Sequence, residues 1–470
     1  MKRLSYRKLM AENKELRQEN AALLKQNAAL KKRIAELEAA LEDAQRRAKR
    51  QAAPFSRDKP KTAPKKPGRK PGRRYGRKAH RPPPPPERID EHYDVPLPDH
   101  CPCCGGVRLR ETHVAAQYQT DIPCRPICRQ FDVHFGTCLD CGRAVHGRHE
   151  LQTSEAVGAA AAQLGPAVHA AMAILNKELG LSHGKVQRCL EILFGISIAR
   201  ATSVHSVLRS GQRCEEAYEK IRQAIRASPC VVPDETGWRV GGKKAWLHTL
   251  VGKEATYYEI DPERGAAVAK GVLGLDWSGL LIHDGWSPYD IFTQARHQQC
   301  LDHLRRRCER ILKTAQRGAV RFPRQLLKLI QTAFAIRDAY RKGDLDADQT
   351  VAEGLALACY LEELTNGHFR YEPNRRLAKH LKKHIWNWFW FLFEPGAEAT
   401  NWQAEQSLRP AVVNRKVWGG NRTWPGARAQ SVLTSVLRTC AQRGRDGFQY
   451  LLRALCLPSP PPLPLPATGR

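Results

Sequence analysis

The chain has 470 residues, of which 42% are hydrophobic, and carries a formal net charge of +30. This length predicts two or more domains, and the excess of positive charge favours a polyanionic partner. Neither a spanning run of roughly 18 to 20 apolar residues nor a signal-peptide pattern is found, so we expect a cytoplasmic protein without membrane contact.

A leucine-zipper pattern occupies residues 1–45, where Leu recurs at every seventh position. The other core positions hold mainly Asn, and an Asn buried in such a seam is satisfied chiefly by its twin across a dimer. The pattern predicts a coiled-coil homodimer through residues 9–41, with a solvated single helix as the alternative. The core positions are Leu9, Asn13, Leu16, Asn20, Leu23, Asn27, Leu30, Ile34, Leu37 and Leu41.

A basic segment rich in Pro and Gly follows at residues 46–90. Between Arg46 and Arg81 it has sixteen Lys or Arg and one acid, Asp58, which is half of the formal charge of the chain. Such a segment cannot bury a core and is expected to be an extended linker. We interpret it as a DNA contact rather than a solubilising spacer, because this charge density releases counterions from a phosphate backbone. The expected DNA-contacting residues are Arg69, Lys70, Arg73, Arg74, Arg77 and Lys78.

Two Cys-x-x-Cys-Gly knuckles, HCPCCG and TCLDCG, lie within residues 91–150. Each knuckle directs two thiolates at one ion, and four thiolates close a tetrahedral Zn²⁺ site. We therefore expect a zinc-ribbon-like module with a structural Zn²⁺. The expected ligands are Cys101, Cys104, Cys138 and Cys141, and the competing thiols are Cys103, Cys124 and Cys128.

Residues 151–228 are expected to form a helical domain, because the pattern is helical throughout between Gly158 and Ser228. A short turn at Gly195–Ser197 separates a first helix from a second that begins near Arg200, which is helix-turn-helix spacing. Such hairpins also occur in proteins that bind no DNA. The surrounding positive charge favours a helix-turn-helix-like DNA-binding domain here.

From Cys230 the pattern becomes strand-like, with four apolar segments in a row. The first is expected to end at Asp234 and the fourth at Asp284, each followed by turn residues. From about Leu304 the chain becomes basic helix for about a hundred residues. Beyond it, Asn401 is expected to cap a helix that carries Glu405 and ends before Pro410.

Two strand-end aspartates and a helix-borne glutamate provide the oxygen ligands of a pair of Mg²⁺ ions about 4 Å apart. Without metal, three clustered carboxylates would repel one another. From the residues alone, the alternatives are a metal site and unrelated surface acids. Glu235, the neighbour of Asp234, is expected to point to the opposite face of its strand.

These motifs together resemble the insertion sequence 66 family of bacterial transposases. The similarity runs from the N-terminal helix to about Leu455, through both knuckles, DETGWRVGGKKAWLH, LIHDGWSPYD, CLDHLRRR, NWQAEQSLRP and VVNRKVWGG. It implies a multidomain α/β protein whose residues 229–455 form an RNase H-like catalytic core with a helical insertion at about 305–395. A Pro-rich tail, 456–470, is expected to be disordered.

The resemblance further implies a DNA transposase with an Asp, Asp, Glu triad at Asp234, Asp284 and Glu405. Mg²⁺ or Mn²⁺ would serve cleavage of element ends and strand transfer of the 3′-hydroxyl into double-stranded target DNA. Accessory proteins of the same element and association with the nucleoid are also expected. Glu394 and Glu398 are fall-back positions for the Glu, and Cys300 and His303 match a Cys-x-x-His of uncertain role. The cations expected to meet phosphates near the Glu are Arg409, Arg415 and Lys416.

Two other classes of protein fit part of the sequence. A dimeric, zinc-containing DNA-binding regulator explains the N-terminal half but not the carboxylates at strand ends. An RNase H-like nuclease would cut without strand transfer. The sequence alone does not separate these alternatives from a transposase.

Overall fold

The computed structural model describes residues 23, 26, 27, 30 and 34 and most of the chain from residue 83 onward. The later described residues are 83–100, 102–112, 114–120, 125–157, 162–394, 396–457, 461 and 463. The chain divides into two compact units, Met1–Asp121 and Ile122–Arg470, and each is described by itself.

From residue 83 to residue 120, the described residues of the first unit form one short element, the 3-10 turn η1 (Pro86–Arg88). The five described residues of the predicted coiled coil are helical and exposed. The other residues of 1–45, and residues 46–82 of the basic linker, lie outside the described part of the chain. The zipper and the DNA-contacting linker therefore stay predictions.

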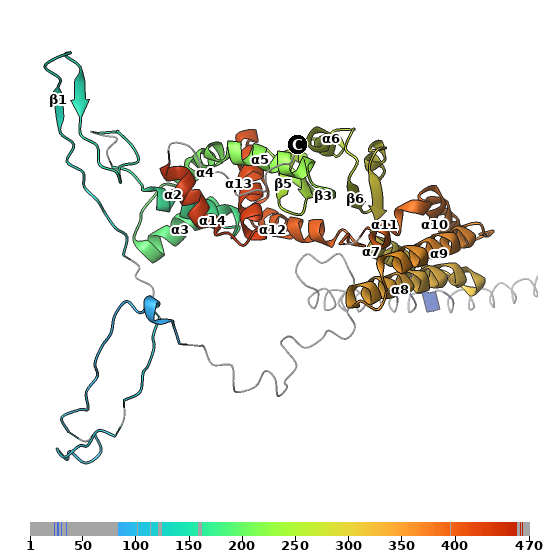
Figure 1. Ribbon diagram of the computed structural model, residues 1–470, viewed down its shortest axis with the longest axis horizontal. Coiled ribbons are helices and arrows are strands. Elements are labelled where there is room, and N and C mark those ends of the chain that lie inside the picture. The colour runs from blue at the N-terminus through green and yellow to red at the C-terminus, as the bar shows by residue number, and fades with distance from the viewer. Residues whose placement is uncertain are drawn as a thin grey trace, which may run out of the picture. The chain divides into compact units, whose positions relative to one another are not determined.

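The second unit begins with a small hairpin of β1 (Phe135–Thr137) and β2 (Ala144–His146), which pair antiparallel (Figure 1). The connection between them contains the second predicted knuckle. Its backbone closes a tight turn, because the N–H of Gly142 donates to the carbonyl of Cys138 at 2.8 Å. Gly142 has φ +66°, a conformation that favours glycine.

Four helices follow: α2 (Pro166–Lys177), α3 (His183–Phe194), α4 (Arg200–Arg213) and α5 (Glu215–Arg226). The predicted helix, turn and second helix are confirmed in α3 and α4. Ser182 caps α3 through the N–H of Lys185, and Gly195 ends it with φ +65°. Val186, Leu190 and Ile198 are buried with Met172 of α2, and this packing fixes the hairpin. Whether it binds DNA stays a prediction.

A five-stranded mixed sheet comes next, with the order β5-β4-β3-β6-β7. Pairs β3 with β4 and β4 with β5 are antiparallel, whereas β3 with β6 and β6 with β7 are parallel. The chain is therefore a mixed α/β protein. The strands are β3 (Cys230–Val240), β4 (Lys243–Val251), β5 (Thr256–Asp261), β6 (Leu280–His283) and β7 (Arg296–Gln299).

The prediction of four consecutive strands was incomplete in two places. Helix α6 (Ala267–Leu273) separates β5 from β6, as a crossover to a parallel neighbour requires. β7 was missed because its sequence, Arg-His-Gln-Gln, has no apolar signal. After β6, the 3-10 turn η3 (Ser287–Ile291) leads toward β7.

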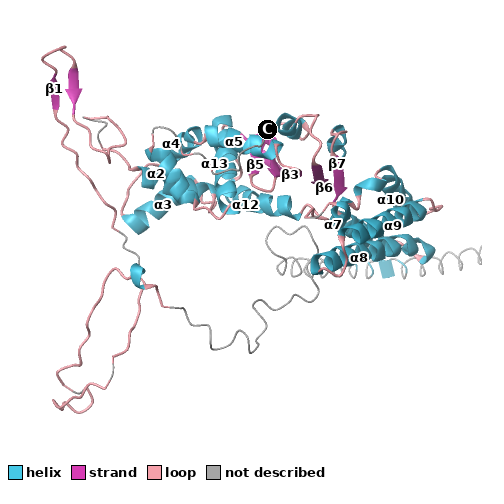
Figure 2. Cartoon of the chain, viewed as in Figure 1, coloured by secondary structure: helices cyan, strands magenta, loops and turns pink. Residues whose placement is uncertain are grey.

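Each face of the sheet is covered by a separate hydrophobic core, because successive strand residues point to opposite faces. Val231 and Leu281 belong to the core shared with α5, α6, α13 and α14, whereas Val232 and Ile282 belong to the core shared with α7 to α11. Figure 2 shows the strands between these two groups of helices. Each of these side chains, when fully buried, contributes about 1.5–3 kcal/mol to the free energy of unfolding.

The region predicted as a helical insertion, about 305–395, is helical. The helices are α7 (Leu301–Leu312), α8 (Arg321–Lys342), α9 (Ala347–Thr365), α10 (Glu372–Lys383) and α11 (Trp390–Phe393), with the 3-10 turns η4 (Arg317–Val320) and η5 (Ile385–Asn387). Of the aromatic residues near its end, Trp388, Phe389 and Phe391 are core and Trp386 is exposed.

The chain closes with α12 (Trp402–Trp418), α13 (Trp424–Gln442) and α14 (Gly447–Cys456). α12 packs on β3 and β4 through a third core that includes Trp238, Leu247 and Leu408. Because Trp238 and Asp234 are four residues apart on one strand, both face α12.

Helix α13 covers the edge strand β5 and takes the place of a further strand. The backbone N–H groups of alternate β5 residues donate to hydroxyl groups at every fourth position of α13. The spacings match because four helical residues advance about 6 Å and two strand residues about 6.6 Å. The pairs are Thr256 with Thr439, Tyr258 with Ser435 and Ile260 with Ser431, at 3.1, 2.8 and 3.1 Å.

Among the described residues, no helix is both long enough and apolar enough to cross a membrane.

Candidate active site

Asp234 lies in the middle of β3, so the prediction that the strand ends there was wrong. The strand continues to Val240 because Val232–Val240 pair with β4 across a two-residue turn at Gly241–Gly242, both with positive φ. Parallel pairing with β6 stops earlier, where Val231 lies opposite Leu281. Asp234 is three residues beyond Val231, and Asp284 is three residues beyond Leu281, just after β6 ends.

Asp284 follows the last residue of β6 and is exposed. Its Oδ1 accepts a hydrogen bond from the N–H of Trp286 at 3.0 Å, which fixes the turn into η3. Gly285 has φ +86°, and its N–H donates to Nδ1 of His283 at 3.2 Å. A Cβ on Gly285 would lie 2.6 Å from Oε1 of Gln299, so this turn requires glycine. Side chains behind the turn thus hold Asp284 in place.

Glu405 lies in the first turn of α12, where the helix dipole favours a carboxylate. Asn401 is at the N-cap, as predicted, but its side chain makes no capping hydrogen bond. Two side chains of α7 approach Glu405 instead: Nη2 of Arg306 donates to Oε1 at 3.1 Å, and Nε2 of His303 is 3.7 Å from the same oxygen. The glutamate thus has a cationic partner.

The prediction that this helix ends before Pro410 was also wrong, because α12 runs through it to Trp418. A proline cannot donate to the carbonyl four residues back, here that of Gln406. Gln406 and Pro410 are both exposed. The helix therefore tolerates the proline on its solvent side and keeps Glu405 and Arg415 on one element.

The three predicted carboxylates act on one another electrostatically. The pKa of Asp234 is raised to about 7, chiefly because burial disfavours its charged form. The charges of Glu235, Asp284 and Glu405 raise it as well, whereas the N–H of Glu235, which donates to Oδ1 at 2.9 Å, lowers it. A buried carboxyl among other acids holds a proton near neutral pH or needs a cation in its place.

Glu235 has a different environment from Asp234. Its Oε1 accepts from Nη2 of Arg264 at 2.7 Å, and its Oε2 accepts from the hydroxyl of Tyr289 at 3.3 Å. The Arg264 guanidinium also lies over Trp246 and Trp286, 4.9 and 4.6 Å from the ring centroids. Glu235 is thus a paired carboxylate beside the candidate site.

The fall-back glutamates pair elsewhere. Glu394 pairs with Arg296, and Glu398 accepts from Arg341 at 3.1 Å. Both charges act on the thiol of Cys230, whose pKa is raised chiefly by burial. Of the three candidates for the Glu, Glu405 is the one whose charge is among the causes that raise the pKa of Asp234.

Within the described part of the chain, no group of three or more His, Cys, Asp or Glu side chains is arranged to hold a metal ion. Cys300 is buried, and burial raises the pKa of its thiol, as expected of a packed cysteine. Nδ1 of His303 is buried without a hydrogen-bond partner among the described residues.

The cations predicted to meet phosphates near Glu405 lie on α12. Arg409 and Lys416 are exposed. Arg415 donates through Nη1 to the hydroxyl of Thr236 at 3.3 Å and also to the carbonyl of Gly237, so it fastens α12 to β3 beside Asp234. The linker cations predicted for DNA lie outside the described residues.

The predicted zinc ligands are divided between the two units. Cys101 lies outside the described residues, and Cys104 belongs to the first unit. Cys138 and Cys141 are in the second, where the pKa of Cys138 is lowered by the N–H groups of Cys141 and Asp140 and by the Cys141 thiol. Such a turn favours a thiolate, and the zinc site stays a prediction.

Sequence reasoning missed Arg306, Arg264 and His283. Arg306 had a signal in the sequence, because it follows Asp302 by four residues on a helix and donates to it at 2.7 Å. Arg264 and His283 had none, since their partners come from other elements.

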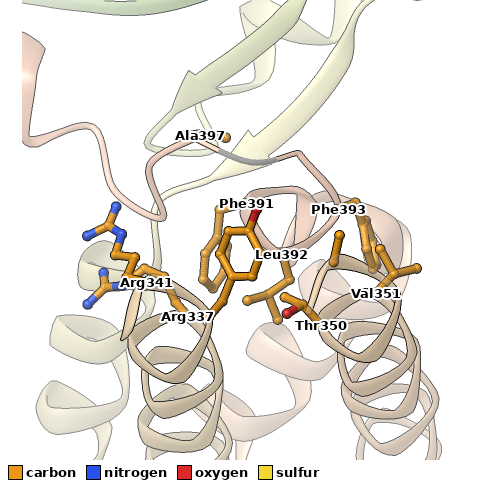
Figure 3. A pocket seen from close by; sticks show the side chains of 11 residues that line it. Arg337, Arg341, Thr350, Val351, Phe391, Leu392, Phe393 and Ala397 are labelled. Atoms are coloured by element: carbon orange, nitrogen blue, oxygen red, sulfur yellow. The ribbon is translucent and has the colours of Figure 1, made fainter. Parts of the chain in front are cut away.

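A pocket lies in the helical region, and none of these carboxylates lines it. Figure 3 shows it between α8, α9 and α11, with a volume of about 180 Å³. Arg337, Arg341 and Thr350 bring polar groups to an otherwise apolar lining that includes Phe391 and Leu392. It contains no side chain of the candidate site.

Comparison with known proteins adds one match. A family model described as transposase IS66 family matches residues 161–429, which is more than half of the chain. The matched region includes Asp234, Asp284 and Glu405. A search of the curated proteins gives no match.

Proposed function

The chain belongs to the IS66 family of transposases, and on this premise we propose that it cuts DNA at the ends of a mobile element and joins the freed 3′-hydroxyl to target DNA. Family membership makes it a DNA-processing enzyme whose partner is DNA. The single observation that supports the proposed chemistry is structural: Asp234 lies on β3, Asp284 directly follows the neighbouring parallel strand β6, and the helix that carries Glu405, α12, packs on β3.

The catalytic core is proposed to be RNase H-like. Three antiparallel strands followed by two parallel ones, in the order β5-β4-β3-β6-β7, support this. Two further features agree with it. Asp234 is on the central strand, level with Asp284 at the end of the parallel neighbour, and Glu405 comes from a helix packed on the same face.

Mg²⁺, or Mn²⁺ in its place, is proposed to bind between Asp234, Asp284 and Glu405. The donor set fits a hard cation, since it offers carboxylate oxygens and a buried acid whose charge is not compensated. When bound, such ions activate water and stabilise the charge on a phosphodiester. Asp234 would give up its proton, Asp284 would be oriented by the N–H of Trp286, and Glu405 would exchange Arg306 for the ion.

An incubation with labelled element ends and a target plasmid, with Mg²⁺ or with chelator, tests the proposal. Joined products that require Mg²⁺ are expected of a transposase. Cut ends without joining would instead indicate a nuclease, and retention of DNA without cutting would indicate a regulator. Accessory proteins of the same element are proposed as partners if joining requires a cell extract.

A structural Zn²⁺ is proposed at Cys101, Cys104, Cys138 and Cys141. The tight turn at Gly142 and the lowered pKa of Cys138 support it. Native mass spectrometry of the full chain is expected to find one zinc, and Cys138→Ser should lose it. The matched control is Cys359→Ser, an exposed thiol on α9. Equal zinc content in both variants would disprove the site.

A homodimer through residues 9–41 is also proposed, on the zipper pattern. Leu23, Leu30 and Ile34 are 51%, 61% and 54% exposed in the single chain, so a partner helix would have apolar side chains to cover. Sedimentation of the full chain should give a dimer, and Leu23→Lys with Leu30→Lys should give a monomer. A monomeric wild type would contradict the proposal.

A further inference from the structure

The helices α7 and α8 carry an unusual run of charge. From Arg310 to Arg337 the chain has seven Lys or Arg and no acid, whereas from Gly343 to Phe369, which includes α9, it has six acids and no Lys or Arg. α8 and α9 pack side by side (Figure 1). Two neighbouring helices of one bundle thus have opposite signs.

Six of the seven cations are exposed, and none has an acidic partner within 4.0 Å among the described residues. The seventh, Arg337, pairs with Asp338. An ordinary solvated helix surface mixes both signs, as α5 does with its pair of Lys220 and Glu216. The cationic face, as we call this set, consists of Arg310, Lys313, Arg317, Arg321, Arg324 and Lys328.

The positions of these residues place the charge on one side of α8. Phe322, Leu326 and Leu329 face the core, and Arg321, Arg324 and Lys328 lie on the exposed side at intervals of three and four residues. From residue 321 to residue 328 the helix advances roughly 10 Å, which equals about three base-pair steps of duplex DNA. A row of this length matches successive phosphates of a DNA strand.

The start of α8 adds to this charge instead of opposing it. The first turn contains no acid, and no side chain caps the helix. Positive side chains at the positive end of a helix dipole are unfavourable unless an anion is nearby. The positive side chains at the start of α8 therefore repel the helix dipole, and a bound polyanion would offset this repulsion.

The cationic face is also connected to the candidate active site. α7 carries Arg306, which donates to Glu405, and Arg310 follows four residues later, with Lys313 at the C-cap of the same helix. Cations thus continue from the carboxylates along α7 to the start of α8. Arg306 itself is paired with Asp302 and Glu405, so the cations that stay unpaired among the described residues begin at Arg310, toward the end of α7.

We propose that the cationic face binds the sugar-phosphate backbone of the duplex that enters the active site. The inference rests on the proposed function only in taking DNA as the substrate, and it adds where the duplex lies: on the end of α7, the turn η4 and the first half of α8, not on α9. Such contacts read no bases, so they would hold element ends and unrelated DNA alike.

The test replaces Arg321, Arg324 and Lys328 by Gln in the full chain and measures binding to a linear duplex by fluorescence anisotropy at several salt concentrations. Each cation that meets a phosphate contributes about 0.9 to the slope of log K against log salt, so the slope should become shallower by about 2 to 3. Gln is a good helix former, so α8 should keep its structure, which circular dichroism would verify.

A matched control removes the same charge elsewhere: Lys253→Gln, Lys270→Gln and Arg453→Gln, all exposed and without an ion pair among the described residues. Its slope should stay close to that of the wild type. An unchanged slope in the α8 variant, or an equal change in the control, would overturn the proposal. Asp284→Asn separates this from the proposed function, because it should abolish cleavage and leave the slope unchanged.

Discussion

The carboxylates around Asp234 and the cationic face of α7 and α8 are both groups of like charge, but they lie in different surroundings. Asp234 is half-buried, where repulsion between charges is stronger than in water, and burial and the neighbouring acids raise its pKa to about 7. The cations of α7 and α8 are in water, where salt screens them over about 8 to 10 Å. The buried group therefore suits a small partner, a proton or a metal ion. The exposed group suits a large one.

The largest effect should come from removing a carboxylate that is proposed to bind metal. Asp284→Asn is expected to slow cleavage of end DNA by about 10³-fold or more, because a lost metal contact costs several kcal/mol in the transition state. Asp344→Asn, an exposed acid outside the site, is the control and should cleave normally. Cleavage is measured on labelled ends. If Asp284→Asn cleaves as fast as the wild type, Asp284 does not bind the catalytic metal.

The next effect concerns stability and its dependence on pH. Since the pKa of Asp234 is 3.8 when unfolded and about 7 when folded, the unfolded state loses its proton first as pH rises. The free energy of unfolding therefore falls between these two values and is lowest above pH 7. Asp234→Asn cannot ionise, so it should be more stable than the wild type at pH 8 by about 2–4 kcal/mol.

Thermal unfolding of both proteins in chelator, at pH 4 and at pH 8, measures this. The difference in midpoint should be large at pH 8 and nearly absent at pH 4. Added Mg²⁺ should stabilise the wild type and not the variant. A variant that is less stable at pH 8 would mean that Asp234 is compensated by a group not considered above.

The smallest effect concerns the ion pair of Arg306 and Glu405, which lies where the carboxylates meet the cations of α7. A divalent ion has to displace this cation, so Arg306→Gln should bind Mn²⁺ more tightly without DNA. The expected change is about 1.5- to 5-fold, since an exposed ion pair is worth about 0.2–1 kcal/mol. Electron paramagnetic resonance of free Mn²⁺ measures it.

Arg305→Gln is the matched control for this prediction. Arg305 pairs with Asp302, as Arg306 does, and with Glu309, but it makes no contact with Glu405. Equal changes in the two variants, or weaker binding by Arg306→Gln, would show that the pair does not oppose the ion.

The strongest sequence patterns predicted the fold well, and the weaker ones failed for physical reasons. Helices α3 and α4 and the helical stretch beyond β7 were predicted by apolar periodicity and turn residues. β7 was not, because it is a polar strand held by its parallel neighbour. The end of β3 was placed at Asp234 because an acid after an apolar run is typical of a turn, whereas Gly241 and Gly242 make the turn.

The candidate site was predicted in part. A register offset of fifty residues between β3 and β6 brings Asp234 level with Asp284, and this offset is a tertiary property that no local pattern contains. Glu405 was predicted from the family resemblance, and its pairing with Arg306 depends on how α7 packs beside α12. The residues were predictable from motifs, and their partners were not.

The hydrogen bonds from the β5 backbone to the hydroxyl groups of α13 affect how the protein folds during its synthesis. Ser431 and Ser435 leave the ribosome more than 170 residues after the strand whose N–H groups they satisfy. Until then β5 presents a bare edge, the feature by which nascent chains pair with one another and aggregate. Products truncated before Trp424 should therefore be insoluble or depend on chaperones, and premature stop codons in such elements would yield aggregates rather than inhibitory fragments.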